Sequence, residues 1–392
     1  MSNRSASPTA RSPEPWIDWG KALAAQCIVW HHLVHYGPLA PRLRSGLPGV
    51  MAWLDERALL AVQVFLVMGG YLAARSLWPA ADRPHGSFAD WPHRMAQRWR
   101  RLLPPYVAAV LLAVLAAMLA RHWMVDDDTP AAPTLAQLAA NLGMVQDVVD
   151  QPALSAGLWY VAIDLQLFAL LAGLAALAAA LMPPAPSGLG RGRLAAGSGR
   201  AASPGRPWRA GIGLLLLGAG ALASLCIFNL QAEGDMWASY FFGSYALGVL
   251  AAWGARSPHR GRWAALLVAL AGAGLLLAWR DRLALAAVVA LVLLWQPGRD
   301  RLAASRAQPL MARLAAMSYA LFLLHYPVSL AVNACFERFV PPSAATAALG
   351  LLTTWGVSMV AAWVAWRLLE QRAAPRTWTR PLALGRSGAR SA

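Results

Sequence analysis

The sequence predicts an all-α, polytopic integral membrane protein with about ten transmembrane helices and both termini in the cytoplasm. Of its 392 residues, 58% are hydrophobic and only 13% are charged, whereas about 25% of the residues of a soluble domain are charged. Apolar stretches of about 20 residues, the length that crosses a bilayer core, recur along the chain. Basic residues also gather in alternate connecting segments, as they do in multi-pass membrane proteins.

Ten stretches have the length and apolar character of a membrane helix. They are approximately Ile17–Tyr36, Leu59–Leu77, Pro104–Ala120, Leu158–Leu181, Gly211–Leu230, Met236–Trp253, Trp263–Trp279, Leu283–Trp295, Leu314–Asn333 and Ala345–Leu368. The seventh and eighth are short because Trp279-Arg280-Asp281-Arg282 separates them. These two can also form a hairpin that crosses the membrane only partly, and in either case the chain ends stay on one side.

The distribution of charge sets the orientation and excludes nucleic-acid binding. If the N-terminus is cytoplasmic, the inside segments hold 27 of the 34 Lys and Arg residues and the outside segments hold 7. This asymmetry follows the positive-inside rule. The net charge of +16 therefore reflects topology, because the basic residues lie between apolar segments and not along one face. Both termini are predicted to be cytoplasmic.

The chain is predicted to form one membrane domain. A disordered cytoplasmic segment covers residues 1–15, the transmembrane domain covers 16–374 with a flexible cytoplasmic linker at 183–209, and a basic cytoplasmic tail covers 375–392. The longest outer loop, 121–157, has apolar residues at helical spacing between residues 134 and 149. We expect an interfacial helix there that caps a site open to the outside.

Two ionisable residues, Lys21 and His32, interrupt the first predicted helix. Such groups are costly in a membrane, so they usually mark a substrate path, a proton relay or a catalytic site. A helix separates the two by about 16 Å, too far for an ion pair. Histidine suits a general base. His31 and His35 share one helix face and His32 points about 100° away; His32 is favoured as the base, and the other two stay open as alternatives.

Two later helices carry polar groups at membrane depth. One contains Leu158-Trp159-Tyr160-Val161-Ala162-Ile163-Asp164-Leu165-Gln166, and the other contains Met317-Ser318-Tyr319-Ala320-Leu321-Phe322-Leu323-Leu324-His325-Tyr326-Pro327. Asp164 can orient His32 or a substrate hydroxyl, or it can form an ion pair with Lys21 or an Arg. His325 is a second imidazole within the membrane.

A basic cluster and a glycine pair complete the motifs. Arg98 and Arg101 precede Leu102-Leu103-Pro104-Pro105-Tyr106 and share one helix face. Their guanidinium groups suit phosphates, although an ordinary cytoplasmic anchor explains either Arg equally well. Gly69 and Gly70 permit the close approach of another helix, and packing is the favoured role.

In their order along the chain, the five motifs resemble those of the acyltransferase 3 superfamily, bacterial inner-membrane proteins that move acyl groups onto cell-surface glycans and related acceptors. The resemblance covers Asp18 to about Ala374. The chain departs from the family pattern where Lys21 replaces an Arg, Asp164 replaces a Glu, and Gln63 and Gly69 replace other common residues.

The resemblance implies a multi-pass inner-membrane O-acyltransferase that moves an acyl group, most simply acetyl, from cytosolic acyl-CoA to a hydroxyl of a cell-surface or lipid-linked glycan. His32 and Asp164 would be the catalytic residues, and Lys21, Arg98 and Arg101 would bind the donor. A second group of candidate site residues comprises His325, Gln166, Trp159 and Tyr319. Acyl-CoA would be a co-substrate, with no bound cofactor and no metal. The expected partners are the glycan or glycolipid acceptor, acyl-CoA and the bilayer.

A transporter is the alternative function. Lys21, His32, Asp164 and His325 could form a relay in a proton-coupled carrier of sugars or acyl groups. Transporters often contain inverted repeats and paired broken helices. The two halves of the chain show no convincing self-similarity, and this observation favours the enzyme.

Overall fold

The computed structural model describes residues 14–77, 91–181 and 206–370, and within these ranges the chain folds into helices without strands. The long helices are α1 (Pro15–His35), α3 (Val62–Leu77), α4 (Trp91–Trp123), α6 (Leu158–Ala180), α7 (Arg206–Cys226), α8 (Ala238–Ala255), α9 (Arg260–Leu277), α10 (Asp281–Trp295), α12 (Gln308–Phe339) and α13 (Ala344–Ala365). The predicted segments 1–15, 183–209 and 375–392 lie wholly or largely outside the described residues. Helix α7 begins at Arg206, inside the predicted linker.

Each predicted membrane segment corresponds to one of these helices. Seven spans among the described residues are long and apolar enough to cross a membrane, and they contain α3, α4, α6, α7, α9, α12 and α13. The other three long helices are α1, which carries Asp18 and Lys21, α10, which has only 15 residues, and α8, which is buried except at Ser239, Trp253 and Ala255. A helix enclosed by protein does not need a lipid-facing apolar surface. The all-helical membrane fold is therefore supported, whereas the count of about ten spans stays a prediction.

Helix α4 begins 13 residues earlier than predicted. The sequence predicted a start at Pro104, but the helix runs from Trp91 with Pro104 and Pro105 inside it. Each proline removes the hydrogen bond to the carbonyl four residues before it, here those of Arg100 and Arg101. Both arginines are exposed, so water or lipid headgroups can solvate these carbonyls. The basic cluster is thus part of the helix.

Side-chain contacts between neighbouring helices define two ends of the bundle. Arg75 of α3 forms an ion pair with Glu14, and we call this end the Glu14 end. At the opposite end, which we call the His35 end, His35 lies 2.8 Å from Asp55. Successive long helices run alternately between the two ends. The positive-inside rule assigns the Glu14 end to the cytoplasm, and that orientation stays a prediction.

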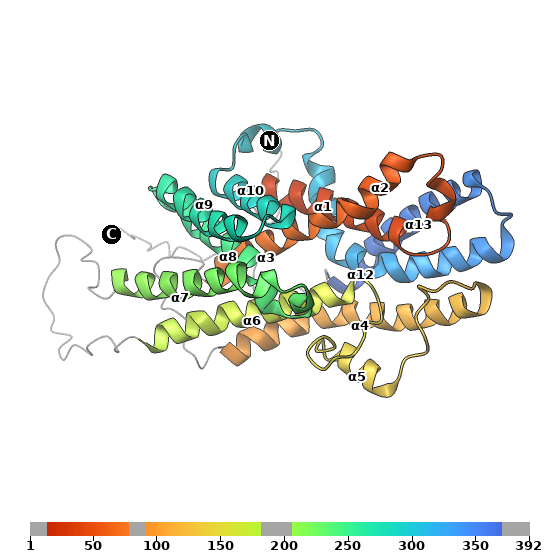
Figure 1. Cartoon of the computed structure of the whole chain (residues 1–392), viewed down its shortest axis with the longest axis horizontal. Helices are drawn as coiled ribbons and strands as arrows, with labels where there is room; N and C mark the ends of the chain where they lie inside the picture. Colours follow the sequence, from red (N-terminus) through yellow and green to blue (C-terminus); the bar gives the residue numbers. More distant parts are fainter. Residues whose placement is uncertain (1–13, 78–90, 182–205, 371–392) are drawn as a thin grey trace, which may run out of the picture.

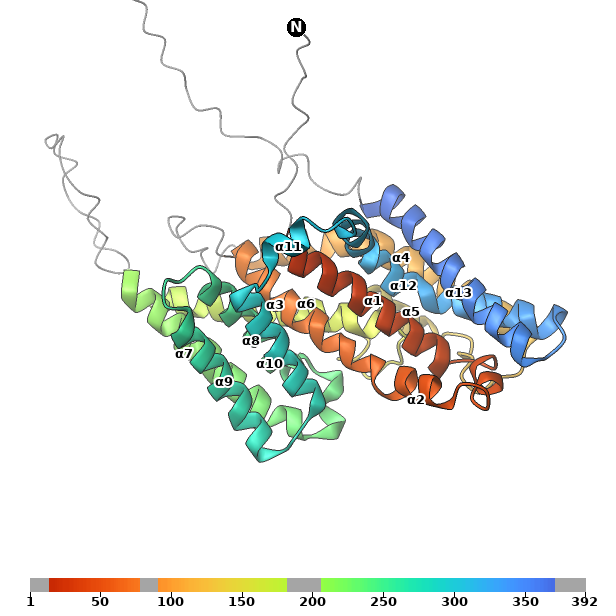
Figure 2. The same ribbon diagram turned by 90° about the horizontal axis from the view of Figure 1, so that it is seen from above.

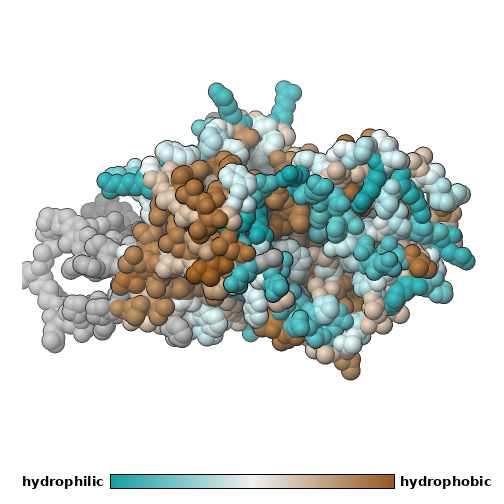
Figure 3. Space-filling model, viewed as in Figure 1, coloured by the Kyte–Doolittle hydropathy of each residue, from teal (hydrophilic) through white to brown (hydrophobic). Residues whose placement is uncertain are grey.

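Helices α7 to α10 gather on one side of the molecule, and α1, α4, α12 and α13 lie on the other (Figures 1 and 2). Helices α3 and α6 lie between the two groups. A continuous hydrophobic surface covers the α7 and α9 side in Figure 3, where Leu215, Val268 and Leu276 are more than half exposed. Such a surface fits contact with lipid.

Helices α3 and α8 cross with their backbones in close contact. A Cβ atom added to Gly70 would lie 1.9 Å from the carbonyl oxygen of Tyr245, and one added to Gly248 would lie 1.9 Å from that of Val67. Only glycine fits either position. The predicted packing role of Gly70 is confirmed.

The loop between α4 and α6 contains the helix α5 (Leu135–Leu142), which begins at the N-cap Thr134. This helix ends earlier than the predicted 149, because Gly143 caps it and Met144 adopts a left-handed conformation with φ 58°. The side chain of Met144 then packs with Tyr106 and Val110 of α4. The loop thus folds back against the middle of α4, and α6 begins partway along the bundle.

Candidate active site

The first polar centre joins α1 and α12 through two buried imidazoles. The Nδ1 atom of His32 lies 2.6 Å from the Nε2 atom of His325. The two rings are nearly parallel, with an interplanar angle of 5° and 4.9 Å between centroids. His32 is 6% exposed and His325 is fully buried. Since α1 and α12 run side by side (Figure 2), residues 293 positions apart form one unit.

The two histidines beside His32 have other partners. The Nδ1 atom of His31 lies 3.1 Å from the carbonyl oxygen of Leu54, and the Nδ1 atom of His35 lies 2.8 Å from a carboxylate oxygen of Asp55. Both contacts attach α1 to the helix α2 (Pro48–Glu56). The structure therefore separates His32 from its neighbours, with contacts that favour structural roles for His31 and His35.

Aromatic side chains continue from His32 toward the His35 end. The ring of Tyr36 lies 5.6 Å from that of His32, and the ring of Tyr326 lies 5.2 Å from that of Tyr36. The Tyr326 hydroxyl donates to the carbonyl oxygen of Asp128, 3.4 Å away, in the long loop. The loop thus reaches the surroundings of His32 through Asp128, which lies outside the segment 134–149 that was expected to form the cap.

The second polar centre joins α4 and α6 nearer the Glu14 end. The Nη2 atom of Arg98 lies 2.5 Å from Oδ2 of Asp164, and these side chains are 25% and 16% exposed. The guanidinium also lies over the ring of Phe168, 4.5 Å from its centroid. Asp164 therefore pairs with an Arg, one of the alternatives that the sequence left open, while the imidazole partner of His32 is His325.

Several buried polar atoms of α4, α6 and α8 have no hydrogen-bond partner among the described residues, and those of Arg98 and Tyr245 lie at this ion pair. They are Nε of Arg98, Nε2 of Gln166 and the hydroxyl oxygens of Tyr106 and Tyr245. Unsatisfied polar groups are costly in a membrane interior, so they usually bind water or a ligand. Gly69 adjoins the same place, because a Cβ atom there would lie 3.2 Å from the Tyr245 ring and 3.4 Å from the Asp164 carboxylate.

The other predicted donor residues lie around Glu370. Arg101 and Lys21 are both within electrostatic reach of this carboxylate. Glu370 ends the π-helical turn Trp366–Glu370 that continues α13. Three helices thus bring charged residues together on the Glu14 side of the bundle, and Arg101 is exposed there.

The remaining candidates have packing or hydrogen-bond partners. The Tyr319 hydroxyl donates to the carbonyl oxygen of Leu102, 3.0 Å away. The aromatic rings of Trp159 and Phe241 pack in a tilted arrangement, with 5.8 Å between the ring centroids. Gln166 contributes the unsatisfied amide described above.

Three aromatic rings separate the two polar centres. Phe322 contacts Tyr160 at 5.3 Å and Phe65 at 6.2 Å between centroids, and its ring lies 6.1 Å from that of His325. On α6, Tyr160 is one helical turn from Asp164. The rings of Phe322 and Tyr160 thus connect the surroundings of His325 with those of Asp164.

Sequence analysis did not single out Phe65, Tyr245 or the contact between the two histidines. The Gly243-Ser244-Tyr245 stretch is a polar interruption of an apolar helix, and this signal could have indicated Tyr245. The pairing of the two imidazoles depends on how α1 and α12 align, which no local pattern encodes.

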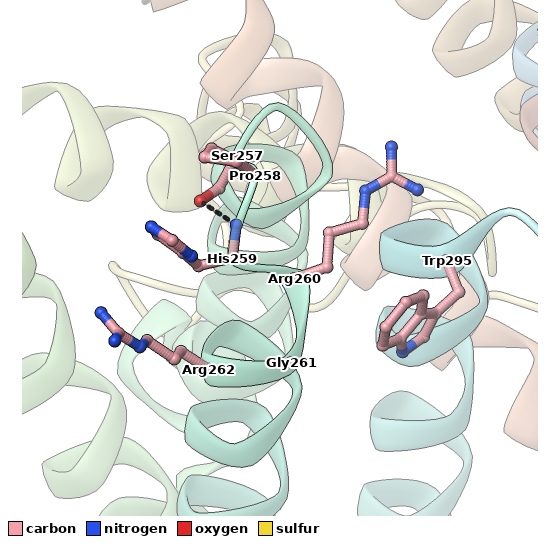
Figure 4. Close-up of a pocket in the computed structure, with 7 residues that line it drawn as sticks. All are labelled: Ser257, Pro258, His259, Arg260, Gly261, Arg262 and Trp295. Carbon is pink, nitrogen blue, oxygen red and sulfur yellow. Dashed lines mark hydrogen bonds between the residues drawn. The ribbon is translucent and has the colours of Figure 1, made fainter.

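A cavity of about 500 Å³ lies elsewhere, at the turn between α8 and α9. It is lined by Ser257, Pro258, His259, Arg260, Gly261, Arg262 and Trp295. Figure 4 shows that Arg260 extends toward Trp295, whereas His259 and Arg262 extend to the other side. The basic groups do not converge on one point, so this hollow does not form a defined anion site.

Comparisons with known proteins agree with the sequence motifs. An acyltransferase domain family model, that of the acyltransferase 3 family, matches residues 14–363. The chain is 30% identical over 157 residues to "Regulator of hypoxia-inducible factor 1" from Caenorhabditis elegans, a match that covers 36% of this chain and 30% of that protein. The chain thus spans less than a third of this relative's length. No solved structure matches the chain.

The family model covers most of the chain and all five motifs, and seven spans among the described residues have the length and composition to cross a membrane. The chain therefore belongs to the acyltransferase 3 family, and its helices are those of a multi-pass membrane protein.

Proposed function

We propose that the protein is an O-acyltransferase of the bacterial inner membrane, and that it moves an acyl group, most simply acetyl, from cytosolic acyl-CoA to a hydroxyl of a cell-surface or lipid-linked glycan. The observation that carries this proposal is the presence of two buried polar centres in one bundle. One contains an imidazole suited to proton transfer, and the other contains an Arg–carboxylate pair among unsatisfied polar atoms.

The donor is assigned to the Glu14 end. Coenzyme A carries phosphates, which bind guanidinium groups well, and Arg101 is exposed on this side. The unsatisfied hydroxyl of Tyr245 and the Nε atom of Arg98 lie deeper. They offer hydrogen bonds to the amide groups of the pantetheine arm. Lys21, within electrostatic reach of Glu370, would contribute positive charge at the same end.

The acceptor is assigned to the His35 end, where Tyr36, Tyr326 and the long loop surround His32. In direct transfer, the acceptor oxygen attacks the thioester carbonyl carbon while His32 takes the hydroxyl proton. A C–O bond forms and the C–S bond breaks. The proton on His32 then passes to the leaving sulfur, so the products are an ester and free coenzyme A. General-base catalysis of this kind contributes about 10²- to 10⁴-fold to a rate.

The test supplies radiolabelled acetyl-CoA to membrane vesicles and measures label bound covalently to glycan. The wild type should transfer label, and His32→Ala should transfer it about 10²- to 10⁴-fold more slowly. The matched control is His31→Asn, whose amide nitrogen can keep the hydrogen bond to the Leu54 carbonyl and whose rate should stay near that of the wild type.

Two results would count against the proposal. If His32→Ala inserts at a normal level and transfers label at the normal rate, then His32 is not the base. If wild-type vesicles move an unmodified solute but attach no label to glycan, the transporter alternative is favoured instead.

A further inference from the structure

The hydrogen-bond chain through the two imidazoles has a defined direction. The Nδ1 atom of His325 lies 3.0 Å from the backbone carbonyl oxygen of Leu321, on the preceding turn of α12. A carbonyl oxygen can only accept, so this Nδ1 atom carries a hydrogen. A neutral imidazole has one donor nitrogen and one acceptor nitrogen. The Nε2 atom of His325 is therefore an acceptor.

The same reasoning fixes His32. Its Nδ1 atom lies 2.6 Å from the Nε2 atom of His325, which accepts, so Nδ1 of His32 donates. A cationic imidazole is costly at this depth, and the neutral form of His32 then has its lone pair on Nε2. The chain thus runs from His32 through His325 to the Leu321 carbonyl, with every hydrogen assigned.

A general base must present a lone pair to its substrate, so the tautomer decides whether His32 can act. Without a fixed acceptor at Nδ1, the hydrogen could occupy either nitrogen. In serine proteases, the loss of the correct histidine tautomer lowers kcat about 10⁴-fold. In that case the group that holds the histidine is charged, whereas His325 is neutral, so a smaller effect is expected here.

We infer that His325 is a positioning residue that holds His32 in the tautomer with hydrogen on Nδ1, so that Nε2 of His32 is the atom that takes the acceptor's proton. The effect of this tautomer on catalysis rests on the proposed function, but the tautomer itself is a property of the folded protein. His31 and His35 do not compete for His325, because their Nδ1 atoms contact Leu54 and Asp55.

Substitutions at His325 test whether this residue acts by accepting the hydrogen bond from His32 or only by filling space between the helices. In His325→Gln, the side-chain oxygen can occupy the place of Nε2 and accept from His32. His325→Leu has similar bulk but no acceptor. We expect His325→Gln to keep kcat within about 10-fold of the wild type and His325→Leu to lower it about 10²-fold, with the KM for acyl-CoA unchanged in both. Equal insertion levels and monodisperse elution in detergent would show that both variants fold.

The ¹⁵N solid-state NMR spectrum of histidine-labelled full-length protein reads the tautomer directly. The chain has eight histidines, and the signal of His32 is identified by its loss in His32→Gln. We expect the wild type and His325→Gln to show hydrogen on Nδ1 of His32, and His325→Leu to show a mixture of tautomers.

The outcomes distinguish this inference from the proposed function. The inference is wrong if wild-type His32 carries its hydrogen on Nε2, or if folded His325→Leu keeps the wild-type kcat. If the wild type transfers no acyl group while His32 still shows hydrogen on Nδ1, the proposed function fails and the assigned tautomer stands.

Discussion

The contacts between α1 and α12 and between α3 and α8 hold the bundle together in different ways. Polar side chains join α1 to α12, where Gln308 donates to Asp18 and accepts from Trp19, each at 2.8 Å, and His32 meets His325. The contact between α3 and α8 includes the hydrogen bond from Ser244 to Gln63. Its closest approach, however, is between backbones at Gly70 and Gly248.

The two contacts should differ in how they tolerate amino-acid substitutions. A backbone crossing cannot accept an added side chain without moving a whole helix, so substitutions there should affect folding first. The polar contact between α1 and α12 has two parts. One part, at Gln308, joins the helices near the Glu14 end, and the other, at His32, contains the proposed base. Substitutions in this contact should affect stability and activity separately.

The largest expected effect is that of Gly248→Ala. The added Cβ atom would lie 1.9 Å from the carbonyl oxygen of Val67 and 2.9 Å from the backbone nitrogen of Tyr71. Because backbone atoms cannot rotate away, we expect a loss of about 3 kcal/mol or more in the free energy of unfolding. The amount of folded, membrane-inserted protein, measured by fluorescence-detected size-exclusion chromatography, should fall sharply.

The matched control for this experiment is Gly272→Ala. Helix α9 contains Gly272, and a Cβ atom there would meet no atom within 4 Å. Since Ala favours a helix over Gly, this variant should be at least as stable as the wild type. Equal yields of folded protein for the two variants would show that the backbone crossing does not limit stability.

An intermediate effect is expected for Gln308→Leu, which breaks the polar contact away from the proposed base. Gln308 is 7% exposed, and its side chain bonds both Asp18 and Trp19. The loss of these hydrogen bonds should cost about 1–3 kcal/mol, measured as a lower midpoint of thermal unfolding. The acyl-transfer rate of the folded protein should stay near that of the wild type.

Gln231→Leu is the control for Gln308→Leu, because Gln231 is an exposed glutamine in a loop. Its midpoint should match that of the wild type. A large loss of kcat in folded Gln308→Leu would show that the two parts of the α1–α12 contact do not act separately.

The smallest expected effect lies outside both contacts, at Asp126 in the long loop. Burial, followed by the charges of Asp128, Asp127 and Glu337, raises the pKa of the Asp126 carboxyl. A carboxyl with a raised folded-state pKa favours the folded state below its unfolded pKa, and this contribution is lost as pH rises through the folded pKa. Wild-type stability should therefore fall slightly as pH rises through this range.

Asp126→Asn should remove this part of the pH dependence. We expect its midpoint of thermal unfolding to be slightly higher than that of the wild type at about pH 7.5 and equal to it at about pH 2.5, because a pH well below the ordinary Asp pKa of about 3.9 leaves the carboxyl neutral in both the folded and the unfolded state. A difference that is the same at both values would show that the charge of Asp126 is not its cause.

Local sequence patterns were sufficient for much of the fold. Apolar length located the ten long helices of the described residues, and the Gly69-Gly70 pair indicated a close helix crossing that the structure contains at Gly70. The start of α4 was missed because Pro104 was interpreted as a helix start, whereas Pro104 and Pro105 both lie inside this helix, one turn after two exposed arginines. Whether a proline starts a helix or lies inside it depends on what surrounds the carbonyl groups that lose their hydrogen bonds.

The candidate site was also predicted only in part from the sequence. The sequence alone indicated which ionisable residues lie in predicted membrane helices, because Lys21, His32, Asp164 and His325 each stand in an apolar segment where an ionisable group is costly. Only the tertiary structure decided their partners, so that His32 meets His325 and Asp164 meets Arg98. The physical reason is that helix formation and membrane insertion depend on neighbours in the chain. The pairing of side chains depends instead on the axial alignment of helices far apart in the sequence, which packing sets.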